Sequence, residues 1–455
     1  MTDHDLLFRS FDHDLDVTLT DVEGELPAEL RGDFLRIGPG LLQCGPDKLA
    51  LLDGLGLVAS LRLGDGAPRL RARLVDTPAL RKARAAGRQA ERFVFTNLPS
   101  RWKNLLNAKL ANPVAHAIYA WAGKLHATDA FGHMALARDT LATVGPSDLT
   151  GAWRGQPTNT AQMMRYCPAS DRLVACLVTG APGKRAKVQV FEVDRSGAVA
   201  QTSHGHLPAG TGNIHDVAVT PNFVLVFQWG QLALGTLLWG AKPAFDAIGC
   251  DPQSTPHLVV IPRAGGELVV DVCGYPGKPS FAATYPPELQ ERFHLTTGPQ
   301  RGPRPTRVHV AANGQVQVRE VASLPTEAPS THPGWHGRPS RFGWSGTHDG
   351  GPATPDDTAF MYFRAIAKVD FETGAVDTWQ AGPRCFVSPV QVVPRPGATR
   401  EDDAWLLAWV LDCENDRTNV VILDAAAPSR GPLATVRGGP VLPAVSHVHF
   451  ASAEP

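Results

Sequence analysis

Apolar and polar residues alternate in short runs along the chain, and the clearest case lies in residues 307–321. There the segment RVHVAANGQVQVREV contains two alternating runs that meet at Asn313-Gly314. A period of two residues sends successive side chains to opposite faces of a strand, and Asn-Gly favours the tight turn of a β-hairpin. The pattern therefore predicts a hairpin with one face packed against a core.

Five further segments show the same arrangement of two strand-like runs about a turn or loop. They are 188–203 about Ser196-Gly197, 366–380 about Thr373-Gly374, 258–272 about Gly265-Gly266, 59–75 about Gly64-Asp65-Gly66, and 405–425 with a longer loop. Helical periodicity is confined to 78–92, 101–111 and 230–240. Many hairpins without a βαβ rhythm predict an all-β protein, and a ring of blades would protect the edges of so many strands. Periodicity alone also allows two β-sandwich domains.

Composition excludes several classes of function. The 455 residues are 43% hydrophobic and carry 43 Lys and Arg against 44 Asp and Glu, a formal net charge of −1. This balance supports a large core and argues against nucleic acid as a partner. The one basic cluster, 80–92, is interpreted as the solvated face of a helix.

The expected environment is the cytoplasm. Seven cysteines lack CxxC spacing, which is typical of reduced thiols. The first residues, MTDHDLLFRS, do not have the pattern of a secretory leader, and no apolar run approaches the roughly 20 residues that cross a bilayer. The expectation is a soluble cytoplasmic protein.

The histidines carry the candidate chemistry, because a glycine-rich phosphate loop and a Gly-x-Ser-x-Gly nucleophile motif are both missing from the sequence. In GNIHDVAVTPNFVLVF, His215 and Asp216 precede an apolar run typical of a buried strand. His215 is either a hydrogen-bonded core histidine or a ligand or base. His447 and His449 alternate with valine in PAVSHVHF, so they face the same side of a strand and could act as paired nitrogen ligands.

Nine segments in order resemble the carotenoid cleavage oxygenase family. They are 25–40, 51–66 with 71–77, 110–132, 213–227, 259–266, 368–374, 392–412, 419–425 and 442–450. The resemblance spans nearly the whole chain and implies an all-β, seven-bladed β-propeller with a helical and loop cap over one end. It further implies one domain over 1–455, with cap elements at about 78–112 and 228–250.

In that family four histidines from four blades hold a non-haem Fe²⁺ ion, and glutamates accept hydrogen bonds from them. By resemblance, His215 matches the second ligand and His447 the fourth. The chain departs from the pattern at the first and third ligands, where Gln162 and Thr284 stand. An amide or a hydroxyl is a weaker Fe²⁺ ligand than imidazole. His257 or His294 is the alternative source of a displaced ligand.

The supporting carboxylates of the family are also replaced. Ser388 and Ala130 stand at glutamate positions, and Asp129 lies beside the second of these. Asp216 is expected to help place the loop that carries His215.

The resemblance, together with the replaced ligand positions, leaves three candidate functions. The first is a non-haem iron dioxygenase that uses O₂ to cleave a C=C bond in an extended apolar conjugated substrate, such as a carotenoid, apocarotenoid or stilbene. The second is an iron-free isomerase, lyase or hydratase with His215 or His447 as the proton-transfer group. The third is a module that binds a hydrophobic metabolite without chemistry.

Three tryptophans fall in the predicted cap, namely Trp102, Trp229 and Trp239. By resemblance they would line the mouth of a substrate tunnel, and Trp102 with the basic residues of 101–111 also has the composition of a helix lying on a membrane surface. Ordinary packing within the cap is the alternative. The pattern makes no prediction of an oligomeric state.

Overall fold

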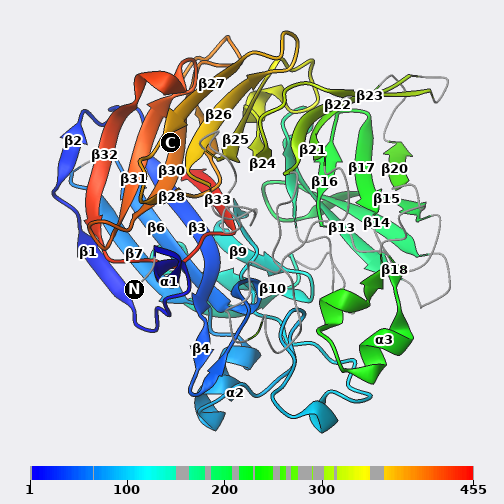
Figure 1. The fold of residues 1–455 in the computed structure, drawn as a ribbon. Coiled ribbons are helices and arrows are strands. Elements are labelled where there is room, and N and C mark those ends of the chain that lie inside the picture. Colours follow the sequence, from blue (N-terminus) through cyan, green and yellow to red (C-terminus); the bar gives the residue numbers. More distant parts are fainter. Residues whose placement is uncertain are drawn as a thin grey trace.

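A computed structural model describes residues 3–64, 66–149, 163–179, 186–207, 215–228, 231–249, 257–262, 268–274, 289, 302–311, 315–348 and 363–453. Within these ranges short strands dominate (Figure 1). The helices are α1 (Asp3–Leu7), α2 (Pro78–Ala86), α3 (Leu234–Trp239) and the 3-10 turns η1 (Leu51–Asp53), η2 (Arg101–Lys103), η3 (Ala244–Ala247), η5 (Pro333–Trp335) and η6 (Pro428–Arg430).

The described strands form seven sheets of three or more strands. The first contains β1 (Leu15–Thr18), β7 (Arg69–Leu74), β6 (Leu55–Leu63), β3 (Gly32–Leu41) and β33 (His447–Ser452). The second contains β8 (Ala117–Trp121), β9 (Lys124–Asp129), β10 (Gly132–Leu136) and β11 (Thr143–Ser147). The third contains β12 (Arg165–Cys167), β13 (Arg172–Thr179), β14 (Lys187–Val193) and β15 (Val199–His206).

The remaining sheets follow in chain order. The fourth contains β16 (Val217–Val219), β17 (Phe223–Gln228) and β20 (His257–Pro262), and the fifth β21 (Leu268–Gly274), β22 (Arg304–Val310) and β23 (Val316–Glu320). The sixth contains β24 (Thr326–Ser330), β25 (Phe342–Thr347), β26 (Ala365–Asp370) and β27 (Val376–Gln380). The seventh contains β28 (Cys385–Val387), β29 (Gln391–Pro394), β30 (Ala404–Asp412), β31 (Arg417–Asp424), β32 (Pro432–Gly439) and β2 (Val22–Gly24). Two short pairs stand apart, β4 (Gln43–Cys44) with β5 (Asp47–Lys48) and β18 (Gln231–Leu232) with β19 (Ile248–Gly249).

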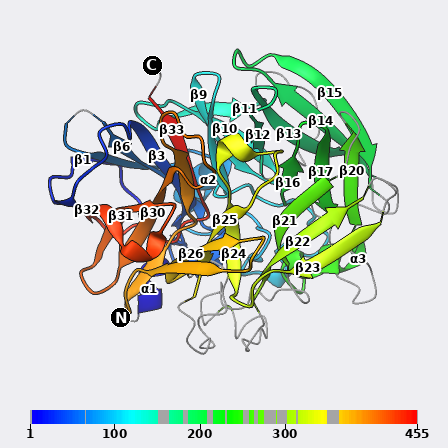
Figure 2. The same cartoon turned by 90° about the horizontal axis from the view of Figure 1, so that it is seen from above.

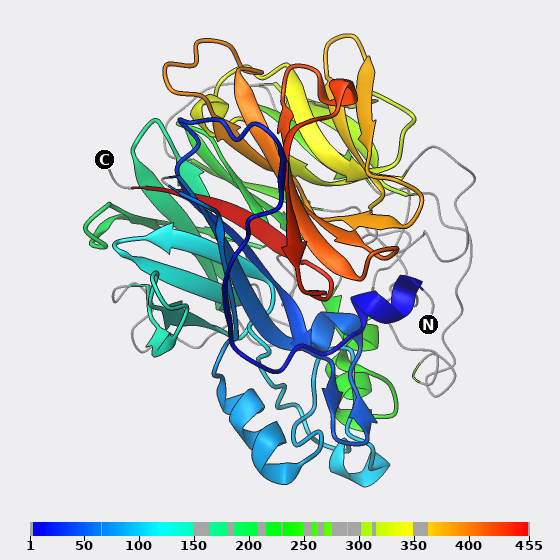
Figure 3. The ribbon, with the colours of Figure 1, turned by 90° about the vertical axis from the view of Figure 1, so that its left-hand side faces the viewer.

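Sheets that follow one another in the chain lie side by side around a ring (Figure 2). β33 contacts β8, β15 contacts β20, β21 contacts β24, β26 contacts β28, and β29 contacts β33. The ring closes within the first sheet, where β33 pairs antiparallel with β3 and Ile37 lies opposite His447. Figure 3 shows these two strands, one from each end of the chain, side by side. The prediction of an all-β protein and of a β-propeller is confirmed.

The core lies between neighbouring sheets. All nine residues of β30 are buried, and Phe34 of the first sheet stacks on Trp409 of the seventh with ring centroids 5.4 Å apart. Trp121 of the second sheet packs in one cluster with Leu173 and Phe191 of the third. Fully burying such a side chain stabilises the fold by roughly 1.5–3 kcal/mol, so these contacts hold the first sheet against the seventh and the second against the third.

Five of the six predicted hairpins are confirmed: β6–β7, β14–β15, β22–β23, β26–β27 and β30–β31 are each antiparallel pairs. The hairpin predicted over 258–272 is wrong. Its first strand, β20, pairs with β17, whereas its second, β21, pairs with β22. The two runs therefore belong to different sheets, the fourth and the fifth.

The predicted helices are shorter than their periodicity suggested. α2 begins after Thr77, whose hydroxyl accepts from Leu80 N, and ends at Gly87 with φ +62°. The helix predicted over 101–111 is wrong, since only the turn η2 forms there. Leu106 has φ +57°, and the Asn104 side chain donates to the carbonyls of Leu98 and Ser100, so the chain folds back on itself as a loop. Within the third predicted helix, 230–240, only α3 forms, at Leu234–Trp239.

The structure adds two observations on environment. The six cysteines within the described ranges are all free thiols. No helix in the described part of the chain is long and apolar enough to cross a membrane.

Candidate functional site

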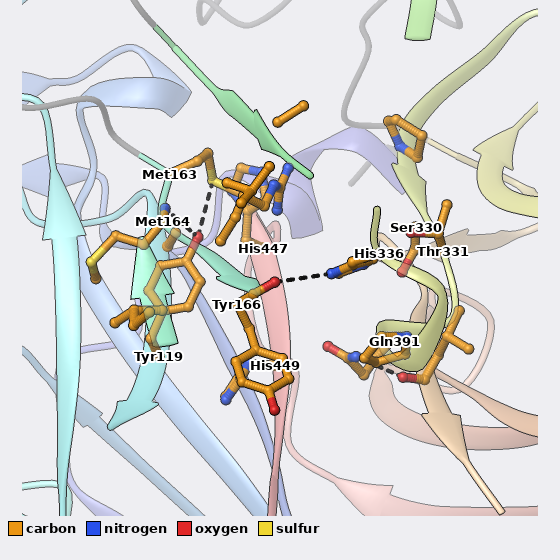
Figure 4. Close-up of a pocket in the computed structure, with 18 of the residues that line it drawn as sticks. Tyr119, Met163, Met164, Tyr166, Ser330, Thr331, His336, Gln391, His447 and His449 are labelled. Carbon is orange, nitrogen blue, oxygen red and sulfur yellow. Dashed lines mark hydrogen bonds between the residues drawn. The ribbon is translucent and has the colours of Figure 1, made fainter. Parts of the chain in front are cut away.

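A cavity of about 1570 Å³ lies where the innermost strands of the sheets meet (Figure 4). Each of the seven sheets contributes lining residues: His447 (β33), Tyr119 (β8), Tyr166 (β12), Val217 (β16), Val270 (β21), Glu327 (β24) and Gln391 (β29). These strands are edge strands of their sheets, except that β29 stands beside β28 at the same end of its sheet. The cavity is therefore on the axis of the propeller, where side chains from distant parts of the sequence converge.

His215 and His447 are brought together at this cavity. Their ring centroids are 6.4 Å apart, although the residues come from the fourth and first sheets. Both line the cavity, with His215 immediately before β16 and His447 the first residue of β33. The convergence agrees with the prediction, and the roles of the two rings as ligands or bases stay a prediction.

A third histidine, His116, lies between these two. Its ring centroid is 4.6 Å from that of His215 and 4.5 Å from that of His447, in edge contacts with both. Sequence reasoning missed this residue. Its signal was a histidine directly before the strand AIYAW, which became the innermost strand β8.

Hydrogen bonding fixes His447 and leaves one nitrogen of His116 without a partner. His447 Nδ1 donates to the His116 carbonyl at 2.8 Å. His116 Nε2 is buried and has no hydrogen-bond partner within the described residues. Buried polar groups are rarely left unpaired in native proteins, so His116 Nε2 is an unusual atom in this site.

The three rings are neutral near pH 7. Burial is the largest cause that holds the pKa of His116 well below its usual range, and the nearby His447, His215 and Arg165 lower it further. Burial also lowers the pKa of His447 to about 4 and lowers the pKa of His215, although His215 is exposed where it lines the cavity. A neutral imidazole can accept a proton or bind a metal through its free nitrogen.

Asp216 pairs with an arginine rather than with a histidine. Its carboxylate forms an ion pair with the guanidinium of Arg165 and accepts from Val217 N at 2.7 Å. Arg165 Nε donates to the Val217 carbonyl at 3.2 Å, so the pair ties β12 to the start of β16. These bonds fix the segment that follows His215, and the expected role of Asp216 in placing the loop that carries His215 stays a prediction.

Neither Ser388 nor Ala130 supports a histidine. Ser388 is buried in the seventh sheet, where its hydroxyl donates to Pro389 O at 2.7 Å and accepts from Trp409 N at 3.0 Å. Asp129, the neighbour of Ala130, accepts from Ala115 N at 3.1 Å and from Ala130 N at 2.7 Å. This buried carboxylate therefore anchors the segment that carries His116, and burial raises its pKa to about 6.

The remaining predicted site residues fall into two groups. Gln162, Thr284, Trp229 and His294 lie outside the described residues, and so does the side chain of His257. Trp102 and Trp239 are on the outer surface, with 81% and 60% of their area exposed, and neither lines the cavity. Their prediction as tunnel residues is wrong, because η2 and α3 turn these side chains toward solvent.

The donor types of this site fit a metal ion of the first transition series. Three neutral imidazoles with one unpaired buried nitrogen are suitable ligands for Fe²⁺, Co²⁺ or Zn²⁺. In this structure the three rings are not arranged to bind one ion together. No three His, Cys, Asp or Glu side chains of the described residues are placed to hold an ion.

Curated relatives match along nearly the full chain. The apocarotenoid-15,15'-oxygenase of Synechocystis is 28% identical over 94% of this chain and 92% of its own length. The lignostilbene-alpha,beta-dioxygenase isozyme III of Sphingomonas paucimobilis is 24% identical over 92% and 90%. The carotenoid isomerooxygenase of Galleria mellonella is 24% identical over 85% and 83%.

A solved structure of such a relative has the same fold as this protein. Cobalt-substituted Synechocystis ACO superposes with a TM-score of 0.90 at 25% identity, covering 99% of this chain and 98% of that one. The family model described as "RPE65: Retinal pigment epithelial membrane protein" matches residues 8–268 and 264–452. The chain therefore belongs to the RPE65 family, which is the family of the carotenoid cleavage oxygenases.

Proposed function

We propose that this protein is an oxygenase that cleaves a C=C bond of an extended apolar conjugated substrate with O₂. The observation that carries the proposal is an axial cavity of about 1570 Å³ that is lined by His215 and His447, with the His116 ring in contact with both. The relatives support it, since their names describe oxygenases of apocarotenoids and of lignostilbene. Each turnover would add one oxygen atom to each carbon of the cleaved bond, so that two carbonyl products balance one O₂.

Fe²⁺, bound by His215 and His447, would supply the activation of O₂ beside the alkene. The chain's own residues have other tasks. Tyr119, Tyr166 and His449 line the cavity together with His336 and Gln391, and His336 Nδ1 lies 3.2 Å from the Tyr166 carbonyl oxygen (Figure 4). The Tyr119 hydroxyl accepts from Met164 N at 3.1 Å and contacts Met163 Sδ at 3.6 Å, which holds this wall rigid beside the histidines.

The second candidate is an iron-free enzyme that isomerises, hydrates or eliminates, or a protein that only binds a hydrophobic metabolite. The observation in its favour is the absence, among the described residues, of three side chains already placed to hold an ion, together with Gln162 and Thr284 in the sequence. Neutral His447 or His215 would then transfer a proton to or from the substrate.

One experiment separates these functions. Full-length protein is loaded with Fe²⁺ and given an apocarotenoid, a carotenoid or a stilbene under ¹⁸O₂, and the products are analysed by mass spectrometry. The proposal expects two carbonyl products, each with ¹⁸O, and their loss with a chelator and in His447→Ala. An isomer formed without O₂ supports the acid–base alternative. Tight binding of all three substrates without any product supports the binding module and overturns the proposal.

We further propose that the seven sheets are seven blades of one domain over 1–455. Each sheet contacts the next around the ring, and α2, η2, α3 and η3 lie at one end of it as a cap (Figures 1 and 3). The limits proposed for this cap are those of the segments 78–112 and 228–250.

The exposed apolar side chains of η2, the loop after it and α3 are proposed to touch a membrane surface from the cytoplasm. Trp102, Leu106 and Trp239 are 81%, 75% and 60% exposed. The two segments form one patch, because Leu106 N donates to Leu238 O at 2.7 Å and the Arg101 guanidinium lies 5.8 Å from the Trp239 ring centroid. Apolar side chains flanked by basic ones suit an anionic lipid interface.

Co-sedimentation with anionic vesicles tests this contact. Trp102→Ser with Leu106→Ser should lower the bound fraction several-fold. Val318→Ser is the matched control, since Val318 is 67% exposed but lies on β23. Equal binding of all proteins would contradict the proposal.

A further inference from the structure

The segment that ends at His116 is held by three hydrogen bonds of its backbone. Gly56 N donates to Pro113 O at 3.0 Å, Ala115 N donates to the Asp129 carboxylate at 3.1 Å, and His116 N donates to Thr128 O at 3.2 Å. The chain turns sharply just before it, with Val114 at φ +53°. These contacts, none of which involves the imidazole, position the His116 ring against the rings of His215 and His447.

The ring itself meets the two histidines that match the family's ligands. Its edge contacts with His215 and His447 place three imidazoles from three different sheets or their leading segments around one small space. Of the two His116 ring nitrogens, Nε2 is buried without a hydrogen-bond partner among the described residues. Packing alone does not require a nitrogen at that point, and a carbon atom would avoid the cost of an unpaired polar group.

The backbone of His116 acts on the same place. Its carbonyl accepts from His447 Nδ1 at 2.8 Å. This bond requires the proton on Nδ1, so His447 keeps a lone pair on Nε2, the nitrogen that is then available to a metal. His116 thus orients one imidazole through its carbonyl and adds a second through its own ring.

We propose that His116 is a metal ligand of this protein, a third imidazole beside His215 and His447. It would compensate in part for Gln162 and Thr284, which by resemblance stand where the family pattern has its other two histidine ligands. The proposal rests on the metal dependence of the proposed function. Because no three side chains of the described residues are placed to hold an ion, coordination requires the His116 and His215 rings to turn about their side-chain bonds, while His447 keeps its bond to the His116 carbonyl.

Cobalt binding tests the proposal without substrate. Full-length protein is freed of metal and titrated with Co²⁺, and the ligand-field absorption and the metal content per chain are measured. Wild type should bind one Co²⁺ ion, and His116→Ala should bind at least tenfold more weakly with a changed spectrum. His204→Ala is the control, because it removes an exposed imidazole of β15 and should bind like wild type. Equal or tighter binding by folded His116→Ala would show that the ring is a bystander or a block.

Two further measurements keep the test decisive. If His116→Ala does not fold, His116→Gln takes its place, because it retains a side chain of similar size. This variant should also bind Co²⁺ more weakly than wild type. X-ray absorption of the wild-type cobalt protein counts imidazoles directly, with three expected and two overturning the proposal. A wild type that takes up no Co²⁺ also overturns it. Oxidative cleavage with unchanged metal affinity in His116→Ala would defeat this inference alone, whereas a three-imidazole site without cleavage of any substrate would defeat the proposed function alone.

Discussion

Among single residues, burial sets the protonation state of the groups around the site. The histidines at the axis are neutral because burial lowers their pKa values, and the same burial raises the pKa of nearby carboxyl groups. Asp53 is the clearest carboxyl case. It is buried, and burial raises its pKa to about 7, against the opposing effect of bonds from Phe95 N and Thr96 and with a further increase from Asp129.

Asp53 makes stability fall as pH rises. Its pKa is about 7 in the folded protein against 3.8 as the ordinary value, so the folded state binds more protons between these pH values, and the free energy of unfolding decreases from about pH 4 to about pH 7. Asp53→Asn cannot titrate and should flatten this slope. Urea unfolding at pH 5 and pH 8 measures it.

Asp171→Asn is the control for this pH dependence. A bond from Arg195 holds the pKa of Asp171 below 3.8, so that group is ionised in both states above pH 5 and leaves the slope unchanged. A slope in Asp53→Asn as steep as in wild type would contradict the assignment.

Between elements, the close approach of β6 to the segment 113–116 positions His116. A Cβ atom added at Gly56 would lie 2.0 Å from Val114 O and 2.8 Å from Val114 C, both backbone atoms. Only glycine lets the two backbones come this near, and the Gly56 N bond to Pro113 O depends on it.

Gly56→Ala should therefore both destabilise the protein and disturb the site. We expect a loss of about 1–3 kcal/mol in the free energy of unfolding from overpacking, and weaker Co²⁺ binding because Val114 and the neighbouring His116 must shift. Gly235→Ala in α3 is the control, since a Cβ there meets nothing within 4 Å. Chemical unfolding and Co²⁺ titration of both variants measure the effects. Cobalt affinity equal to wild type in Gly56→Ala would separate this glycine from the site.

In the whole molecule, the pairing of β33 with β3 closes the ring. Six consecutive residue pairs, from Gly32 with Ser452 to Ile37 with His447, join the two ends of the chain in one sheet. The same strand brings His447 and His449 into the cavity. The strand β33 therefore both closes the ring of sheets and supplies two histidines of the cavity.

Deletion of residues 447–455 should lower the thermal unfolding midpoint strongly, because it opens the ring and leaves the hydrogen-bonding edge of β3 unpaired. His447→Ala removes the same imidazole but keeps the strand, and its midpoint should stay near that of wild type. Scanning calorimetry compares them. If both variants unfold at the same temperature, the ring does not depend on this closure.

Two predictions of secondary structure from sequence failed, one because strands paired between sheets and one because local side-chain bonds overrode helical spacing. The run 258–272 reads as a hairpin, but β20 and β21 belong to different sheets. The segment 101–111 has helical spacing, but Asn104 side-chain bonds and the positive φ of Leu106 make it a loop. Matching to the family pattern found His215 and His447, while His116 matched no expected ligand and was passed over.

By itself the sequence determined the strands, most of the hairpins and the all-β class, because period-two alternation and turn residues act over a few neighbouring positions. It also supplied the histidines and the unusual residues Gln162 and Thr284. Only the tertiary structure decided that His116, His215 and His447 meet. Their convergence depends on how the sheets pack around the axis, and packing between sheets leaves no local pattern in the chain.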